Sequence, residues 1–465
     1  MSNKTAEKKQ WGARFESKTD PLFEKFTSSI SYDKKLAPYD IQGSIAHTQA
    51  LILCGVLTKA SGEKIITGLK NVLHDIISGH MQWDDRLEDI HTHIEVALRK
   101  KIGSLADKLH TARSRNDQVV TDLRLYLKEA SQNLDVKLNK LQEVLWHAAV
   151  DNKDVIIPGY THLRRAQPVL LAHHWLSYME MFQRDRDRIQ DAYKRIDVLP
   201  LGSCALAGTS INIDRHYVAK QLGFSRVSEN SMDAVSDRDF VTEVMSAIAL
   251  IGIHLSRLSE ELLIWSTEEF NYIKLPQSFC SGSSAMPHKM NPDIPELIRG
   301  KSARLIGNLM QNLTMQKALP LTYNRDLQED KMSLFDSVES ALDMMEICAA
   351  VLSKTEVNEK HLKQIWEKDY SWALDLAEFL VRKGLEFRKA HEVVGRLVLY
   401  CDKKMKNISD LTLDEVRLFS PHFDEDYYKF ADPAYSVKLK LSMGSTSPQE
   451  VSKQLRKWKK RLRFS

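Results

Sequence analysis

The sequence predicts an all-α protein built around long helices. Its 18 glycines and 13 prolines make up under 7% of the 465 residues, whereas these two residue types account for roughly 12% of average usage. Because glycine and proline are the residues least compatible with a helix interior, their scarcity favours long uninterrupted helices. Long stretches also carry apolar residues at helical spacing, and no internal repeat or convincing strand pattern is visible.

Three long segments carry apolar residues at steps of three and four. This spacing places the apolar side chains along one side of a helix. A helix of about 30 residues is roughly 45 Å long at 1.5 Å per residue. The three series are Leu127, Ala130, Leu134, Leu138, Leu141, Leu145 and Ala148; Val244, Ile248, Ile251, Leu255, Leu258, Leu262 and Trp265; and Leu327, Leu334, Val338, Leu342, Met345 and Val351, which follow Asp326.

Two further long helices are predicted between these segments, one opening at Pro168 and one covering about 294–317. A proline near the start of a helix suits its first turn. The five predicted helices occupy about 113–352 and leave polar loops at 153–167, 199–235, 270–293 and 318–326. Long loops in a compact protein are usually functional, so we expect the chemistry of the protein to lie in them.

The pattern of helices divides the chain into three predicted domains. A small helical N-terminal domain covers 1–112, a central long-helix bundle covers 113–363, and a small helical C-terminal domain covers 364–465. Long helices with continuous apolar seams are hard to cover within one subunit. We therefore expect copies of the chain to pack together as a homo-oligomer.

The bulk composition argues against several classes of protein. The net charge of +4, from 66 basic and 62 acidic residues, is too balanced to indicate a nucleic-acid partner. The five cysteines are scattered and form no CxxC motif, as in a reduced cytosolic protein. The polar start MSNKTAEKKQ lacks the apolar core of a signal peptide, and the apolar run at 246–256 is about half a membrane span. We expect a cytoplasmic protein that binds no membrane.

Four polar stretches fall in or beside the predicted loops: HTARSRNDQ (110–118), GYTHLRRAQP (159–168), GSSAMPHKMNPD (282–293) and LTYNRDLQEDK (321–331). Each places small hydroxyl or amide donors next to a cation. Such donors bind carboxylate oxygens, and the cations offset the charge of the carboxylates. A histidine in the second stretch adds a group that changes protonation near neutral pH. Together they indicate a substrate with several carboxylates.

Each of these stretches also has a purely structural interpretation. GSS beside proline can form a turn and a helix cap, ARSRND can start a helix, and LTYNRD can cap the helix that follows it. A lone histidine such as His162 is commonly structural. His91 and His93 suggest a metal pair, but residues two apart do not share a helix face and no third ligand is evident, so no metal site is predicted. The basic tail QLRKWKKRLRFS is interpreted as a solvated helix end rather than a nucleic-acid contact.

A family resemblance adds to this interpretation. The stretch GSSAMPHKMNP resembles the signature of the fumarase/aspartase superfamily, whose members release fumarate from a succinyl adduct. HTARSRNDQVVTDLRLYL, GYTHLRRAQP, the PLGS…ALAGTS…IDR region and LTYNRDLQEDK resemble the argininosuccinate lyase family within it. The resemblance runs from WGARF near residue 11 to the C-terminal region, and its motifs are highly specific when taken together.

The resemblance implies a fold, an assembly and a reaction. The fold is all-α and homotetrameric, with a core of long helices from four subunits, and each active site is assembled from loops of three chains. The reaction is cleavage of argininosuccinate to arginine and fumarate, a step of arginine biosynthesis, without a cofactor or a metal ion.

The resemblance also implies roles for individual residues of this chain. Ser283 and His162 are the two proton-transfer groups, with the assignment of base and acid left open. Lys289 and the backbone N–H groups of its loop would stabilise the serine anion. Glu296 would orient His162 across a subunit boundary, and the 282–293 loop would close over the substrate. The substrate contacts implied are Ser29, Arg115, Asn116, Thr161, Asn291, Tyr323, Gln328 and Lys331.

Two positions depart from the family pattern. Cys204 stands at a glycine position of the PLG-x-GA pattern, where a bulkier side chain affects the shape of the loop. His288 replaces the glutamine that argininosuccinate lyases often carry, and the form AMPHK is typical of adenylosuccinate lyases. This signature alone therefore does not select the substrate, whereas ARSRNDQ and THLRRAQP favour argininosuccinate.

Two alternatives follow from the same resemblance. One is adenylosuccinate lyase or another fumarate-releasing lyase. The other is a non-catalytic structural protein, because some lens crystallins derive from this family. The presence of Ser283, His162, Lys289 and Asn116 favours an enzyme.

Overall fold

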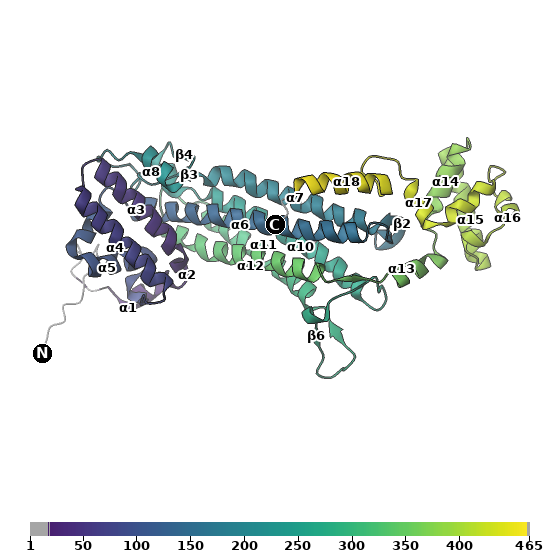
Figure 1. The fold of residues 1–465 in the computed structure, drawn as a ribbon, viewed down its shortest axis with the longest axis horizontal. Helices are drawn as coiled ribbons and strands as arrows, with labels where there is room; N and C mark the ends of the chain where they lie inside the picture. The colour runs from purple at the N-terminus through teal and green to yellow at the C-terminus, as the bar shows by residue number, and fades with distance from the viewer. Residues whose placement is uncertain (1–16, 18, 463–465) are drawn as a thin grey trace. The chain divides into compact units, whose positions relative to one another are not determined.

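The computed structural model describes residues 17 and 19–462 and divides into two compact units (Figure 1). The first unit contains the described residues up to Ser131 together with Ala192–Glu243 and Met310–Phe335. The second contains Gln132–Asp191, Val244–Leu309 and the described residues from Asp336 onward. The predicted domain boundaries near 112 and 363 stay predictions. The polar start and WGARF lie outside the described residues.

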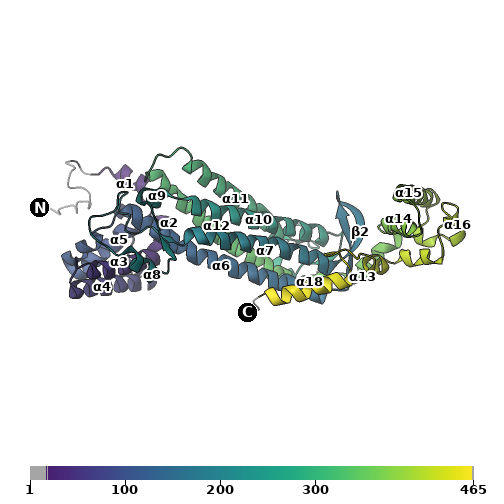
Figure 2. The same cartoon turned by 90° about the horizontal axis from the view of Figure 1, so that it is seen from above.

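Five long helices dominate the structure, as the sequence predicts (Figures 1 and 2). They confirm the all-α fold class. Most residues of the three predicted apolar series are fully buried, because a continuous stripe at helical spacing faces neighbouring helices. The five helices are α6 (Arg115–Asp151), α7 (Leu171–Ile196), α10 (Asp239–Ser266), α11 (Asp293–Gln316) and α12 (Asp330–Leu352).

Helix α10 is the most apolar of the five. Among the described residues, it is the one helix long and apolar enough to suit a membrane span. However, 61% of its apolar 18-residue window is buried inside the protein. Burial of this kind is typical of a core helix.

The first unit contains a helical layer formed by α3 (Ala37–Leu53), α4 (Lys59–Ile77) and α5 (Ile90–Ile102). Helices α4 and α5 approach so closely at Gly68 that an added Cβ would lie 2.6 Å from Leu98. Shorter helices complete this unit: α1 (Pro21–Thr27), α2 (Ile30–Asp33), α8 (Arg215–Leu222) and α9 (Ser231–Ser236).

The second unit contains a separate apolar core near the C-terminus. It is built from α14 (Ala373–Arg382), α15 (Phe387–Lys404), α16 (Leu413–Arg417) and α17 (Pro433–Lys438), around buried residues such as Leu380. Helix α13 (Glu359–Gln364) precedes these helices in the chain. The basic C-terminal stretch forms α18 (Pro448–Arg461), whose Leu455 carbonyl accepts a 3.0 Å hydrogen bond from Trp146 Nε1.

Short strands correct the expectation that the chain has none. The longest pair is an antiparallel hairpin of β1 (Ile156–Thr161) and β2 (Arg164–Leu170). The others are β3 (Val198–Leu199) with β4 (Arg226–Val227), β5 (Ile273–Lys274) with β8 (Glu356–Val357), and β6 (Ser281–Gly282) with β7 (Met290–Asn291).

Two predicted boundaries were wrong. Pro168 does not open a helix; it lies in β2 opposite Pro158, and α7 begins at Leu171. Proline lacks an N–H group, so an edge strand tolerates it as readily as a first helical turn does. The predicted loop at 199–235 contains α8 and α9, which are too short to show a helical period.

Candidate functional site

Ser29 and Gln328 lie on segments of the first unit that contact each other. The Ser29 hydroxyl donates to Asp33 Oδ2 at 2.5 Å, and its N–H donates to the Glu88 carbonyl at 2.8 Å. Gln328 Nε2 donates to the Thr27 carbonyl at 3.3 Å. Burial raises the pKa of Asp33 and so favours its neutral form.

Lys331 and Tyr323 both lie close to the charged side chains of Asp330 and Arg238. The Lys331 ammonium donates to Asp330 Oδ1 at 2.8 Å, and Arg238 Nε donates to Asp330 Oδ2 at 2.6 Å. Burial raises the pKa of Tyr323, and Arg238 and Asp330 act on it through their charges. The structure thus brings four of the predicted substrate contacts, Ser29, Tyr323, Gln328 and Lys331, into the first unit.

Arg115 is engaged by groups of its own unit. Its Nη1 donates to Gln118 Oε1 at 2.7 Å and to Glu95 Oε1 at 3.3 Å, and its Nε lies 3.5 Å from Asp89 Oδ2. Burial lowers the pKa of this guanidinium, but Asp89 and Glu95 outweigh that effect and raise it. Its predicted contact with a substrate carboxylate stays a prediction.

Asn116 is held by a loop of the first unit. Its Nδ2 donates to the Ala205 carbonyl at 3.1 Å, and the next residue, Asp117, holds the same loop through two further hydrogen bonds. Asp117 Oδ2 accepts from the N–H groups of Gly202 at 2.9 Å and Cys204 at 2.8 Å. The sequence interpretation missed Asp117, although it adjoins Asn116 in the ARSRND stretch.

Cys204 adopts a backbone conformation that favours glycine. Its φ is +54° and that of Gly202 is +95°, so both lie in the left-handed region. An added Cβ at Gly202 would lie 2.8 Å from Arg215, whose guanidinium donates to the Leu201 carbonyl at 3.0 Å. Cys204 is therefore a strained residue in this turn.

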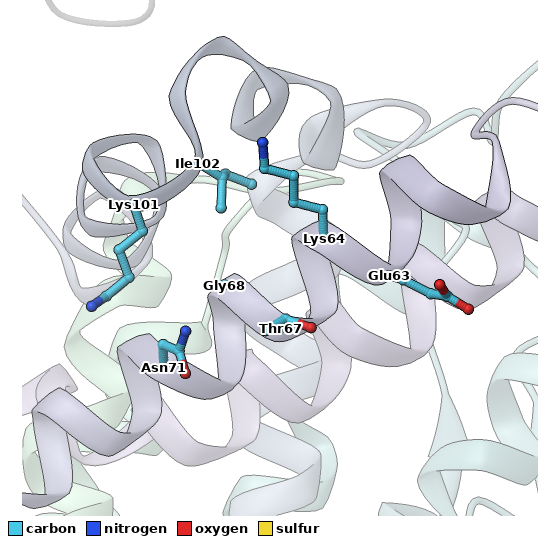
Figure 3. Close-up of a pocket in the computed structure, with 7 residues that line it drawn as sticks. All are labelled: Glu63, Lys64, Thr67, Gly68, Asn71, Lys101 and Ile102. Atoms are coloured by element: carbon cyan, nitrogen blue, oxygen red, sulfur yellow. The ribbon is translucent and has the colours of Figure 1, made fainter.

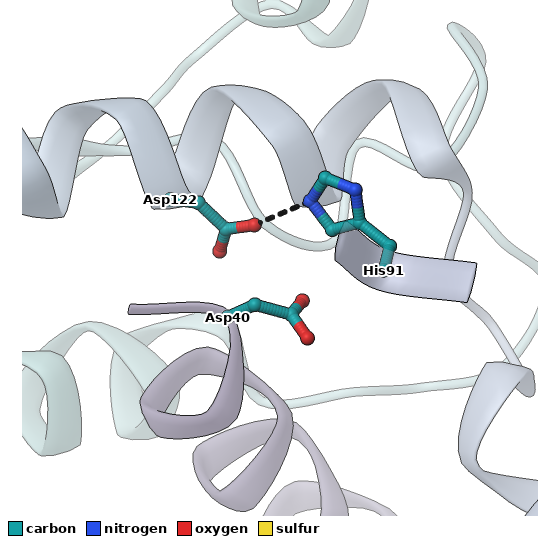
Figure 4. A group of neighbouring side chains, drawn as sticks. All are labelled: Asp40, His91 and Asp122. Carbon is teal, nitrogen blue, oxygen red and sulfur yellow. Dashed lines mark hydrogen bonds and ion pairs between the residues drawn. The ribbon is translucent and has the colours of Figure 1, made fainter. Parts of the chain in front are cut away.

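A buried charge cluster lies in the same unit as these residues (Figure 4). His91 Nε2 and Asp122 Oδ2 are 2.8 Å apart, and Asp40 supplies a second carboxylate, so that three possible metal-ligand atoms lie within 4.8 Å of one another. Such a set could hold a cation, but protonated His91 already supplies a positive charge there. His93 lies outside it, because its Nε2 accepts from the Asp84 N–H at 3.0 Å.

The protonation of this cluster follows from its surroundings. Burial opposes the charge on His91, but Asp89 and Asp122 outweigh burial and raise the pKa of His91 to about 10. Burial and the charge of Asp40 raise the pKa of Asp122 to about 7. The folded cluster therefore holds protons more tightly than the unfolded chain.

In the second unit, Thr161 and His162 lie at the tip of the β1–β2 hairpin. Thr161 pairs with Arg164, and His162 and Leu163 form the two-residue turn between them. The tip side chains are exposed, and Leu163 is 79% exposed. The hairpin therefore presents the predicted proton-transfer histidine to its surroundings.

Ser283 lies on a second hairpin of the same unit, closed by β6 and β7. Asn291 Nδ2 donates to Ser281 Oγ at 3.2 Å and so ties the two strands together. Ser283 Oγ accepts from the N–H groups of Ala285 at 3.3 Å and Met286 at 3.1 Å. These bonds supply the backbone donors that the sequence interpretation expected around the serine oxygen.

The other predicted residues of this region are not joined to Ser283 or His162 in the described part of the chain. Lys289 and His288 are exposed on the hairpin, and Glu296 is exposed in the first turn of α11. No hydrogen bond between Glu296 and His162 is present among the described residues. The predicted roles of Lys289 and Glu296 stay predictions.

A cavity of about 510 Å³ between α4 and α5 contains none of the predicted site residues (Figure 3). Lys101 at its rim is paired with Asp75 at 2.7 Å. The lining residues are Glu63, Lys64, Thr67, Gly68, Asn71, Lys101 and Ile102.

Family models match both the long-helix region and the C-terminal segment. A model described as lyase matches residues 13–307, and one described as argininosuccinate lyase C-terminal matches residues 370–438. The chain is 49% identical to the argininosuccinate lyase of Syntrophotalea carbinolica over 448 residues, which cover 96% of this chain and 97% of that protein. It is 47% identical to the argininosuccinate lyase of Geobacter sulfurreducens over 454 residues, which cover 98% and 99%.

Solved structures share the fold. A variant of EDDS lyase with bound fumarate has a TM-score of 0.83 and 27% identity, over 96% of this chain and 91% of that chain. A class II fumarase from Schistosoma mansoni has a TM-score of 0.75 over 89% of this chain and 93% of that chain. At 17% identity, the second similarity concerns the fold alone.

Replacing Cys204 with glycine should stabilise the protein. A non-glycine residue in the left-handed region costs about 1–2 kcal/mol, and glycine loses about 0.5–1 kcal/mol more on folding, so we expect a gain of about 0.5–1 kcal/mol. Thermal denaturation of Cys204→Gly would measure it as a higher midpoint. Cys204→Ala keeps the Cβ atom and should show no gain; an equal gain in both variants would contradict the strain argument.

The His91–Asp122 pair should make stability depend on pH. Because the pKa of His91 is raised from its ordinary 6.5 to about 10, its contribution is complete below pH 6.5 and is lost as the pH rises toward 10. The raised pKa of Asp122, about 7, adds a loss of the same sign as the pH rises from about 4.

Urea denaturation from pH 6 to 10 would check this expectation. The double variant His91→Gln with Asp122→Asn keeps neutral hydrogen-bonding groups and removes both titrations. Its denaturation midpoint should fall less steeply with pH than that of the unmodified protein. Parallel profiles would show that the pair is not the source of the dependence.

Proposed function

The chain belongs to the argininosuccinate lyase family, and we propose that it cleaves argininosuccinate to arginine and fumarate. Near-full-length relatives of 47–49% identity carry that name, and the C-terminal family model matches as well. The structural observation that best supports the reaction is the pair of backbone N–H groups directed at Ser283 Oγ.

The reaction needs a base, an acid and donors for developing charge. A base removes a proton from the carbon next to a carboxylate, the electrons left behind delocalise into that carboxylate, and the C–N bond then breaks to give fumarate. The departing guanidinium nitrogen takes a proton from an acid. Donors already in place around the doubly charged intermediate lower its free energy.

Ser283 serves as the base and His162 as the acid in this proposal. A serine hydroxyl is a poor base unless its anion is stabilised, and hydrogen bonds donated to an oxygen favour its anionic form. The N–H groups of Ala285 and Met286 donate to Ser283 Oγ. Lys289, six residues further along, adds a positive charge to the same hairpin.

The remaining predicted residues bind the substrate. Hydroxyl, amide, ammonium and guanidinium groups recognise carboxylates through directed hydrogen bonds, and these residues supply such groups. In the first unit they are Ser29, Asn116, Tyr323, Gln328 and Lys331, with Arg115 beside them; in the second they are Thr161 and Asn291.

We propose a homotetramer whose active sites take residues from three chains. Exposed apolar residues on one face of α11 support an oligomer: Ile306, Met310 and Leu313 are 41–55% exposed. Gly307 on this helix has no atom within 4 Å of an added Cβ, so another helix can approach closely there. Contiguous exposed apolar residues mark protein interfaces. The scattered cysteines and the absence of disulfides among the described residues support a cytoplasmic location.

Ser283→Ala should abolish turnover while preserving the fold. Loss of a positioned base costs about 10²- to 10⁴-fold in rate, and His162→Asn should lose activity similarly. The assay is fumarate absorbance after addition of argininosuccinate, with circular dichroism as the folding check. Ser278→Ala, on an exposed turn five residues earlier, is the matched control and should keep full activity.

Each alternative result would have a distinct meaning. Turnover by Ser283→Ala at the control rate would remove Ser283 from the mechanism. Fumarate release from adenylosuccinate but not from argininosuccinate would change the proposed substrate. No turnover of either substrate by the unmodified protein would favour a structural role.

Mixing His162→Asn with Ser283→Ala should restore activity if these two residues reach one site from different chains. After subunit exchange at equal amounts, roughly a quarter of the sites would carry both intact residues. The double variant made in one chain is the inactive control. Mass spectrometry of differently tagged chains would verify exchange, and no recovery after verified exchange would contradict shared sites.

A further inference from the structure

The tip of the β1–β2 hairpin adopts an unfavourable backbone conformation. His162 has φ +51° and Leu163 has φ +57°, so both turn residues lie in the left-handed region. Two-residue turns of this type match the twist of the strands but strongly prefer asparagine and glycine. Each non-glycine residue in that region costs about 1–2 kcal/mol. Such a tip persists only where the surrounding structure holds it in place.

The tip itself makes little contact that would hold it. Residues 161–164 are exposed, and Leu163 is 79% exposed. Within one chain, the restraint has to come from the strand pair next to the tip, where Arg165 pairs with Tyr160 across the two strands, beside a register shift at Gly159.

Arg165 is anchored to a segment 204 residues further along the chain. Its Nη1 donates to Asp369 Oδ2 at 2.9 Å and to the Ile365 carbonyl at 3.2 Å. Asp369 is itself fixed, because its other oxygen accepts from the Ser371 N–H at 2.6 Å and from the Ser371 hydroxyl. The Asp369 side chain is 4% exposed, so its charge depends on Arg165 for compensation.

Two phenols extend the anchor to the first strand. The hydroxyls of Tyr160 and Tyr272 are hydrogen-bonded to each other, and both interact with the Arg165 guanidinium. Phe270 packs edge-on against Tyr272, with ring centroids 5.4 Å apart. The Tyr160–Tyr272 bond and the Arg165–Asp369 pair thus join both strands of the hairpin to other parts of the second unit.

We infer that Arg165, through its ion pair with Asp369, is a positioning residue that holds His162 in its working orientation. This inference rests on the proposed function, in which His162 transfers a proton. The segment around Asp369 would then help to position His162 for the reaction. That segment itself supplies none of the proposed proton-transfer or substrate-binding groups. A planar guanidinium suits this task because it binds the Asp369 carboxylate and the Ile365 carbonyl together through its fixed, directional N–H donors.

The test compares Arg165→Met, Asp369→Asn and their double variant in the full-length protein. Methionine keeps much of the length of arginine and removes its charge. Misplacing a catalytic group by about 1 Å can cost 10²-fold, so we expect kcat to fall on the order of 10- to 100-fold with a much smaller change in KM. Because the two residues act as one pair, the double variant should lose little more kcat than either single variant.

Lys440→Met is the matched control. It removes a cation that pairs with the buried carboxylate of Asp375 in the same C-terminal segment, and it leaves the Arg165–Asp369 pair intact. We expect it to lower the thermal midpoint and to leave kcat unchanged. Arg165→Lys restores the charge without the planar fork, so its kcat should lie between those of Arg165→Met and the unmodified protein.

Hydrogen–deuterium exchange gives a readout that does not depend on activity. Amides of residues 157–169 should exchange faster in Arg165→Met and at the unmodified rate in Lys440→Met. Unchanged exchange of the hairpin, or faster exchange with unchanged kcat, would overturn the inference. Should Arg165→Met fail to fold, the same two measurements on Arg165→Lys decide the matter. Failure of the unmodified protein to release fumarate would instead refute the proposed function.

Discussion

The geometry of the first unit depends on the compensation of buried carboxylates. Asp117 is fully buried and accepts hydrogen bonds from the N–H groups of Ser114, Gly202 and Cys204. The first of these bonds fixes the start of α6, and the other two fix the loop that holds Asn116. Burial raises the pKa of Asp117, while the three N–H groups oppose that shift. An uncompensated carboxylate in this position would cost several kcal/mol, so the loop and the helix start are coupled through one side chain.

The second unit holds its proposed proton-transfer residues on hairpins rather than through buried carboxylates. His162 and Ser283 lie on hairpin tips, and short strands fix each tip at its base. Side chains at such tips reach outward, which suits a site completed by other chains but leaves their orientation dependent on the anchors. For Ser283 the anchors are Asn291 and Asp293, whose carboxylate accepts from the Ser281 N–H at 2.7 Å. For His162 the anchor is the pair of Arg165 and Asp369.

The sequence contained enough information to predict the long helices but not the contacts between their loops. The helical spacing of Leu134, Leu138 and Leu141 is enough to predict that these residues are buried, and they are. A two-residue strand such as β6 has no period to detect, and Pro168 is compatible with both a helix start and an edge strand. The carboxylate partners Glu95 of Arg115, Asp122 of His91 and Asp369 of Arg165 lie 20, 31 and 204 residues away in the sequence, and no local pattern encodes such separations.

The ion pairs also change the electrostatic interpretation of the candidate site. The sequence suggested that Arg115 and Lys331 offset the charge of substrate carboxylates, yet Arg115 faces Asp89 and Glu95, and Lys331 faces Asp330. Arg238 shares Asp330 with Lys331, and this group is buried. Among the predicted site residues that the structure describes, Lys289 is the one lysine or arginine without a carboxylate partner. Substrate carboxylates in the proposed reaction would then be recognised in the first unit mainly by hydroxyl and amide donors. Hydroxyl and amide donors bind only where their directions and spacing match the substrate. A pre-organised set of them is therefore more selective for one substrate than net positive charge is.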